Sequence, residues 1–157
     1  MMEIPISEIM TRDVITVPAA MPVQEVAKIL AEKHITGLPV IDEKDNVVGV
    51  LSELDIISRH GATAADIMSA QVISVSPDTD AEDVAHLLTN RRIRRVPVLA
   101  EGKLIGIVSR SDLMRLFTIT RWVCEDCGYF ERGFERPTRC ASCGSEHFTL
   151  HREPQGM

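Results

Sequence analysis

Four cysteines near the end of the chain have the spacing of a metal site. Cys124 and Cys127 form one C-x2-C pair, and Cys140 and Cys143 form a second pair after twelve intervening residues. Two such pairs bring four thiolates together as a tetrahedron, which suits zinc or iron. The chain has no other cysteine, and this spacing is typical of metal ligation rather than of a disulfide framework. We therefore predict one ion, zinc or iron, held by these four residues.

A second pattern with possible chemistry occurs twice. The segments "GVLSELD" at 49–55 and "GIVSRSD" at 106–112 share the form GxxSxxD. A Ser followed three residues later by an acid, before an apolar run, is typical of the capping box that begins a helix. The same groups also suit a ligand, because a helix N-terminus with a Ser hydroxyl attracts phosphate and an ionised Asp accepts hydrogen bonds from ribose hydroxyls. Helix capping and binding of a ribose phosphate are both open, and they are compatible.

The two motifs differ in charge, and a cluster of arginines lies before the second. "SRSD" offers Ser111 and Arg110, whereas "SELD" has Glu53, which disfavours phosphate at the first motif. The segment "RRIRR" places four guanidinium groups at Arg91, Arg92, Arg94 and Arg95. Such a run is either a solvated basic patch or a phosphate-binding cluster, since Arg gives bidentate contacts to phosphate.

The elements that must position these residues form a repeat. When residues 9–41 are shifted by 58 positions, eleven of the 33 positions are identical, and the offset then falls to 57. Fixed-period similarity indicates two copies of one supersecondary unit. Hydrophobic periodicity predicts β-α-β-β-α in each copy, hence an α/β fold with two copies sharing a core. The expected ranges are 14–17, 23–33, 38–41, 47–51 and 52–58 in the first copy, and 72–75, 80–90, 96–99, 104–108 and 109–117 in the second.

Composition narrows the class of protein. The chain has 157 residues, a net charge of −6 and 45% hydrophobic residues. It shows no apolar run of membrane-spanning length and no signal-like start, so we expect a cytoplasmic protein. The negative charge argues against broad nucleic-acid binding. No Ser-His-Asp order, paired carboxylate site or P-loop is present, and we expect no enzymatic activity.

The repeated features together resemble the paired CBS motif, or Bateman module. They are "IM-x-x-x-VIxV" at the start of each copy, "IxxLPV" or "IxxVPV" in the middle, and GxxSxxD at the end. The resemblance covers 5–61 as the first motif and 62–119 as the second, which would pack as a pseudo-symmetric pair. It implies a regulatory site for an adenosine compound (AMP, ADP, ATP or, in some members, S-adenosylmethionine) and a homodimer formed through the helical faces.

The resemblance also implies where the ligand lies. The Asp of one motif holds the ribose, and the base lies against the early strand of the other motif. Carried over, the first set contains Ser109, Arg110, Ser111 and Asp112, facing Thr11, Asp13, Val14, Ile15, Ile35 and Thr36. The second set contains Ser52 and Asp55, facing Val72, Ile73, Ile93, Arg94 and Arg95.

The cysteine segment, 120–150, resembles a zinc ribbon and, more closely, the rubredoxin-like domain at the end of rubrerythrins. Trp122, Gly128, Tyr129, Pro137 and Phe148 fall at matching places. The resemblance implies a small metal-bound β ribbon, which a flexible tail at 151–157 would follow.

Three functions are consistent with these features. The first is a non-enzymatic regulatory protein that binds an adenosine nucleotide between the CBS motifs and uses the ribbon as an interaction or output module. The second is a redox protein with a rubredoxin-like iron centre under nucleotide control. The third is a nucleic-acid-binding zinc ribbon, which the acidic charge makes the weakest.

Overall fold

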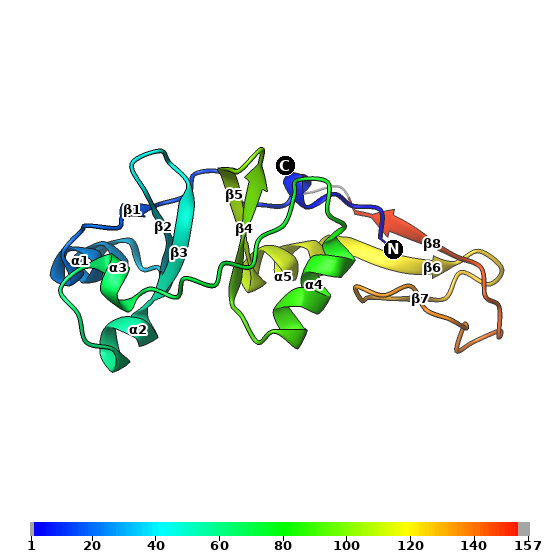
Figure 1. Cartoon of the computed structure of the whole chain (residues 1–157). Coiled ribbons are helices and arrows are strands. Elements are labelled where there is room, and N and C mark those ends of the chain that lie inside the picture. Colours follow the sequence, from blue (N-terminus) through cyan, green and yellow to red (C-terminus); the bar gives the residue numbers. More distant parts are fainter. Residues whose placement is uncertain (1, 154–157) are drawn as a thin grey trace. The chain divides into compact units, whose positions relative to one another are not determined.

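The computed structural model describes residues 2–153, and the α/β fold class is confirmed. The first repeat region contains η1 (Ile6–Glu8), β1 (Val17–Pro18), α1 (Val23–Lys33), β2 (Gly37–Ile41), β3 (Val47–Ser52) and α2 (Glu53–Ser58). The second contains α3 (Ala64–Ile67), α4 (Ala81–Asn90), β4 (Arg95–Ala100), β5 (Lys103–Ser109) and α5 (Arg110–Ile119). The cysteine segment contains β6 (Thr120–Cys124), β7 (Phe130–Glu131) and β8 (Phe148–Arg152). Figure 1 follows these elements along the chain.

The chain divides into two compact units, and neither coincides with one repeat. Among the described residues, the first unit contains 2–11, 76–96 and 108–153, and the second contains 12–75 and 97–107. Each repeat therefore contributes residues to both units. The boundaries predicted for the two motifs stay a prediction.

The start of each repeat docks on the other repeat, and the same hydrogen bonds hold it in both units. In the second unit, the backbone N–H groups of Val23, Ala64 and Ala65 donate to the carbonyls of Ala62, Met21 and Ala19 at 2.9–3.0 Å. In the first unit, the N–H groups of Ala81, Ile6 and Ser7 donate to the carbonyls of Ile4, Thr79 and Pro77 at 2.8–3.0 Å. Every one of these six pairs maps onto a pair of the other set when the residues are shifted by the repeat period. The two units are therefore assembled in the same way: the starting segment of each repeat docks on the other repeat, an arrangement here called the exchange of starts.

The second unit packs its helices on a three-stranded sheet in the order β1-β2-β3. β1 pairs parallel to β2, and β2 pairs antiparallel to β3 with Val40 opposite Gly49. Gly49 is the glycine of the first GxxSxxD motif. A Cβ there would lie 2.4 Å from the Met68 sulfur and 2.9 Å from the Ser69 carbonyl. Only glycine, which has no Cβ, leaves room at position 49 for the Met68 side chain and the Ser69 backbone. The buried core contains Val17, Val26, Leu30, Leu38, Val40, Leu51, Ala64 and Ile67.

The early strands are shorter than predicted. Of the range 14–17, only Val17 lies in β1, opposite Val40; of the range 72–75, only Val75 pairs, in a parallel bridge to Val98. The missing part is the start of each predicted range, 14–16 and 72–74, whereas Pro18 and Pro77, which have no N–H to donate, lie after the paired residue and limit the ladder only at its other end. The helices and central strands match the predicted ranges to within two residues at each end.

The cysteine segment begins without a linker. β6 starts at the residue after α5 ends, and it is the central strand of the sheet β7-β6-β8 (Figure 1). His151 and Arg152, which we assigned to the tail, form the end of β8, and residues 154–157 lie outside the described residues. Among residues 2–153, no helix has the length and apolar character needed to cross a membrane.

Asp80 holds the exchanged start of the first repeat in place. Its side chain is buried, and its carboxylate accepts hydrogen bonds from the N–H groups of Met2 at 3.1 Å and Ile4 at 3.0 Å. We predict that Asp80→Ala lowers the free energy of unfolding by about 2–3 kcal/mol, because two buried N–H groups lose a charged acceptor. Chemical denaturation measures the loss. Asp83→Ala is the control, because Asp83 is exposed and lies in α4, the helix that Asp80 precedes. An equal loss of unfolding free energy in both variants would contradict this role of Asp80.

Candidate functional site

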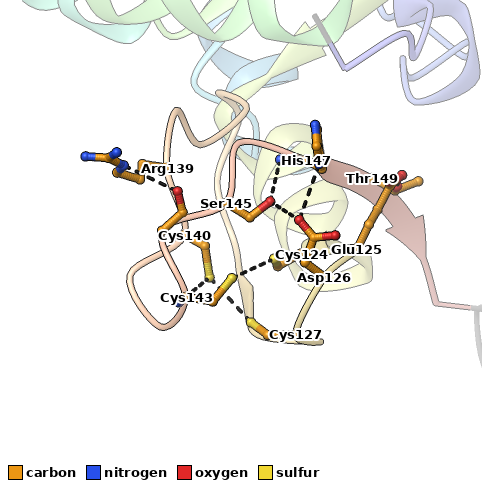
Figure 2. A network of polar contacts seen from close by, with 11 residues as sticks. Cys124, Glu125, Asp126, Cys127, Arg139, Cys140, Cys143, Ser145, His147 and Thr149 are labelled. Carbon is orange, nitrogen blue, oxygen red and sulfur yellow. Dashed lines mark hydrogen bonds and ion pairs between the residues drawn. The ribbon is translucent and has the colours of Figure 1, made fainter.

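The four cysteines meet at one point of the first unit. Their sulfur atoms all lie within 4.8 Å of one another (Figure 2). The Cys124 and Cys143 sulfurs are 3.6 Å apart, and so are those of Cys127 and Cys140. Cys124 and Cys140 are buried, whereas Cys127 and Cys143 are exposed. The sequence spacing therefore correctly predicted a convergent four-thiol cluster.

The two C-x2-C turns have the same backbone geometry. The N–H of Gly128 donates to the Cys124 carbonyl at 3.0 Å, and the N–H of Gly144 donates to the Cys140 carbonyl at 2.9 Å. Both glycines adopt a positive φ, 81° and 79°, which places the chain in the left-handed region after each turn. The N–H groups of Cys124 and Cys140 donate to Tyr129 and Ser145, five residues further on, each at 2.7 Å. This pairing presents the cysteines in two equivalent turns.

The pKa values of two neighbouring thiols are shifted in opposite directions. Burial opposes ionisation of Cys140, but the N–H groups of Cys143 and Ser142 and the neighbouring thiols outweigh it and lower its pKa to about 7. The backbone N–H of Ser145 favours ionised Cys143, yet burial and the thiols of Cys127, Cys124 and Cys140 raise its pKa to about 12. Four thiolates this close repel one another, and a bound cation removes that repulsion. The donor set fits one zinc or iron ion, which would neutralise the thiolates and close the ribbon.

The loop 132–135, here called the docking loop, anchors the ribbon to α5. Arg132 donates to the carbonyls of Thr118 at 3.0 Å and Thr120 at 2.9 Å, and the Gly133 carbonyl accepts from the Trp122 indole at 3.2 Å. The rings of Phe134 and Phe117 lie 5.9 Å apart between centroids. Successive residues of this loop therefore contact α5 and β6, which fixes the loop against the helix.

The second GxxSxxD motif forms a polar cluster at the start of α5. Asp112 is buried, at 2% exposure. One carboxylate oxygen accepts from the Ser109 N–H at 2.8 Å and the Ser109 hydroxyl at 3.1 Å. The other accepts from the Thr11 hydroxyl at 3.1 Å and pairs with Arg115. The Ser111 and Ser109 hydroxyls are 2.7 Å apart. The structure thus brings four predicted site residues together: Thr11, Ser109, Ser111 and Asp112.

The first motif forms the same capping box in the second unit. The Asp55 carboxylate accepts from the Ser52 N–H at 2.8 Å, and Arg59 lies 3.5 Å from its second oxygen. Both motif helices are held at their first residue. Glu53 N–H donates to the Thr36 carbonyl at 2.9 Å, and the matching Arg110 N–H donates to the Arg94 carbonyl at 3.3 Å. Thr36 therefore lies at the Asp55 helix and Arg94 at the Asp112 helix, the reverse of the sets that the resemblance implies, because each carbonyl accepts from the motif helix of its own repeat.

The remaining predicted residues lie in loops and at strand ends, except Arg110, which is the first residue of α5. Val14 lines a pocket of about 400 Å³ in the second unit, together with Arg12, Lys103 and Leu104. Ile15 and Ile35 pack against the core of the same unit. Exposure is partial at Val72, Ile73, Ile93 and Arg95 and high at Asp13 and Arg110.

Sequence reasoning missed Arg115 and the docking loop. Arg115 lies three residues after Asp112, so helical spacing alone could have placed it on the same face. The contact of Arg132 with the Thr118 and Thr120 carbonyls could not be predicted in this way, because no repeat or helical spacing in the sequence relates the two segments.

Comparison with known proteins now decides the family. A family model described as the CBS domain matches residues 6–60 and 64–118. The chain belongs to the CBS domain family. The CBS domain-containing protein YhcV of Bacillus subtilis is 30% identical over 115 residues, which cover 69% of this chain and 81% of that protein.

Solved CBS structures share the fold. The structure titled CBSX2 in complex with AMP has a TM-score of 0.68 and 33% identity, and the match covers 71% of this chain and 94% of that one. The CBS domain pair of protein MJ0100, in complex with 5-methylthioadenosine and S-adenosyl-L-methionine, has a TM-score of 0.69 and 30% identity, with 73% and 96% covered.

The matched region is a part of several relatives. The protein MK0525 of Methanopyrus kandleri is 31% identical over 125 residues, which cover 74% of this chain and 64% of that protein. The inosine-5'-monophosphate dehydrogenase of Methanocaldococcus jannaschii is 31% identical over 111 residues, only 22% of that enzyme. The family match ends at residue 118, before the first cysteine. The four-cysteine segment therefore has to be interpreted from its own geometry.

Metal removal tests whether the four thiols close the ribbon. Trp122 is the only tryptophan, it is 3% exposed, and it lies on the strand that leads to Cys124. We predict that a strong chelator exposes Trp122 and shifts its fluorescence to the red, because a segment this small has little apolar core without its metal. Helical circular dichroism should change little, since the CBS helices have their own core. Loss of metal without a change in fluorescence would contradict the prediction.

Proposed function

We propose that the chain is a non-enzymatic regulatory protein that binds an adenosine nucleotide through the second GxxSxxD motif. The observation that carries the proposal is the cluster at Asp112. A buried carboxylate with two serine hydroxyls stands at the start of a ten-residue helix. A ribose hydroxyl would take the place of Thr11 or Arg115 at the carboxylate oxygen that these two share, and the helix start with its serines suits a phosphate.

Relatives of the same family support an adenosine ligand. Two structures that match most of the repeat region are titled as complexes with AMP and with S-adenosyl-L-methionine and 5-methylthioadenosine. These ligands share adenosine and differ in charge. The adenosine part is therefore what the ligands of these relatives have in common. We propose that this chain distinguishes between such ligands by the charge of the group attached to adenosine.

The arginine cluster favours a phosphorylated ligand. The Arg94 carbonyl accepts a hydrogen bond from the Arg110 N–H, which places Arg94 at the start of the helix that carries Asp112. Arg91, Arg92 and Arg94 are exposed. We propose that this cluster, with Arg110, provides the positive charge for the phosphates. The first motif has Glu53 in the place of Arg110, so we assign it to a less charged ligand.

The ribbon is the proposed output module. α5 carries Asp112 near its first residue and passes directly into β6, and the docking loop holds the ribbon against the end of that helix. A ligand at Asp112 would thus contact the start of α5, and the ribbon contacts the end of the same helix. We also propose a homodimer through the helical faces, because Leu54, Ile57 and Met114 are 66%, 79% and 53% exposed. Sedimentation at micromolar concentration measures the oligomeric state, and a monomer would overturn the dimer.

A redox protein is the second candidate, since two of the four cysteines, Cys127 and Cys143, are exposed. Exposed ligands would bring an iron centre close to an electron-transfer partner. The absorption spectrum and metal content of the purified protein separate the candidates. Ferric iron in four thiolates is strongly coloured and loses its colour on reduction, whereas zinc is colourless and redox-inactive. A colourless zinc protein would exclude the redox candidate.

Calorimetry on matched variants tests the nucleotide site. We predict that Asp112→Asn weakens AMP and ATP binding by about ten- to a hundredfold, because losing a charged acceptor costs about 1.5–3 kcal/mol. Asp55→Asn should affect these ligands less. Replacing Arg94 and Arg95 by Ala should weaken ATP more than adenosine.

Asp66→Asn is the control for the loss of a cap. Asp66 accepts from the N–H groups of Ala62 and Thr63 and from the Thr63 hydroxyl, in a capping box outside both GxxSxxD motifs. It should leave nucleotide affinity unchanged. Equal affinity in the wild type and Asp112→Asn, at unchanged stability, would reduce the second motif to a helix cap.

A further inference from the structure

Three side chains gather where the docking loop meets α4, and none of them belongs to the four-cysteine cluster or to the Asp112 cluster. Glu82 and His86 lie one turn apart on α4, and Glu135 comes from the docking loop. The His86 Nε2 is 3.1 Å from a Glu135 oxygen and 3.7 Å from a Glu82 oxygen. One ligand atom from each residue lies within 4.8 Å of the other two. The group therefore joins a helix of the second repeat to the metal ribbon.

The distances suit a metal ion. A tetrahedral zinc ion with nitrogen and oxygen ligands at its usual 2.0–2.2 Å holds neighbouring ligand atoms about 3.3–3.5 Å apart. The two distances at His86, 3.1 and 3.7 Å, lie on either side of that range. The third pair, Glu82 with Glu135, lies within 4.8 Å. A side-chain movement of at most about 1.5 Å would bring that pair to the tetrahedral spacing.

The backbone on both sides of the group is already fixed. Residues at i and i+4 share one face of a helix, so α4 presents Glu82 and His86 together. The docking loop is held by Arg132 on the Thr118 and Thr120 carbonyls, and by Phe134 on Phe117. Glu135 is the next residue. Ligands on anchored backbone lose less entropy on binding an ion than ligands on a free loop.

We propose that Glu82, His86 and Glu135 form a second metal site, for a divalent transition-metal ion such as zinc. Imidazole and carboxylate suit this class of ion, and water completes the coordination because His86 and Glu135 have 45% and 68% exposed side chains. The bound ion ties α4 to the ribbon. It is independent of the proposed nucleotide site.

The site is tested by titrating Zn²⁺, without nucleotide, into protein whose four-cysteine metal content has first been measured. The wild type should bind one further equivalent of Zn²⁺ by calorimetry. His86→Ala and Glu135→Gln should each weaken this second step at least tenfold and leave the cysteine-bound metal unchanged. The second equivalent should also raise the thermal midpoint of the wild type and of neither variant.

A matched control is available on the ribbon. His147 and Asp126 form another exposed histidine–carboxylate pair, with 3.3 Å between Nδ1 and Oδ2 (Figure 2), and residues 2–153 offer no third ligand group beside it. His147→Ala should therefore keep the second step. A wild type that binds no further Zn²⁺, or a second step that survives in His86→Ala, would overturn the proposal and leave His86 with an ion-pair role only.

Discussion

The fold depends on a short piece of backbone pairing that crosses between the repeats. Six hydrogen bonds, three in each unit, dock the start of one repeat on the strand-to-helix turn of the other. The docked segment contributes to the core of each unit: Ala64 and Ile67 belong to the core of the second unit, and Ile4 and Ile6 are buried in the first. The motif helices are then held at their first residues through Thr36 and Arg94. The polar clusters at Asp55 and Asp112 stand on this frame.

The two GxxSxxD motifs share one local structure, the helix cap. In both, the aspartate accepts from the serine N–H and so begins a helix. The surroundings make them different. Asp112 is buried and is reached by Thr11, whereas Asp55 is half-buried. A cap that only stabilised a helix would need neither the burial nor the second hydroxyl at Ser111.

The sequence predicted the features that depend on local spacing. The helix starts at Ser52 and Ser109, the α/β class and the meeting of four cysteines all follow from patterns of a few residues. The contact of Thr11 with Asp112 joins residues 101 positions apart, and only the family resemblance, not local spacing, suggested it. Features that depend on long-range pairing were missed. The exchanged starts place residues 4–7 beside 77–81, between 70 and 77 positions away, and hydrophobic periodicity contains no information on such a partner. The docking loop was missed for the same reason.

The exchange of starts determines what happens when the repeats are separated. A cut between residues 61 and 62 divides the chain where the repeats divide, yet it severs both compact units. Each half then carries a starting segment whose docking turn is on the other half. Two copies of one half can satisfy this need only by trading their starts, as in a domain-swapped dimer. The covalent duplication therefore acts as an intramolecular swap, which makes the pairing of repeats independent of protein concentration.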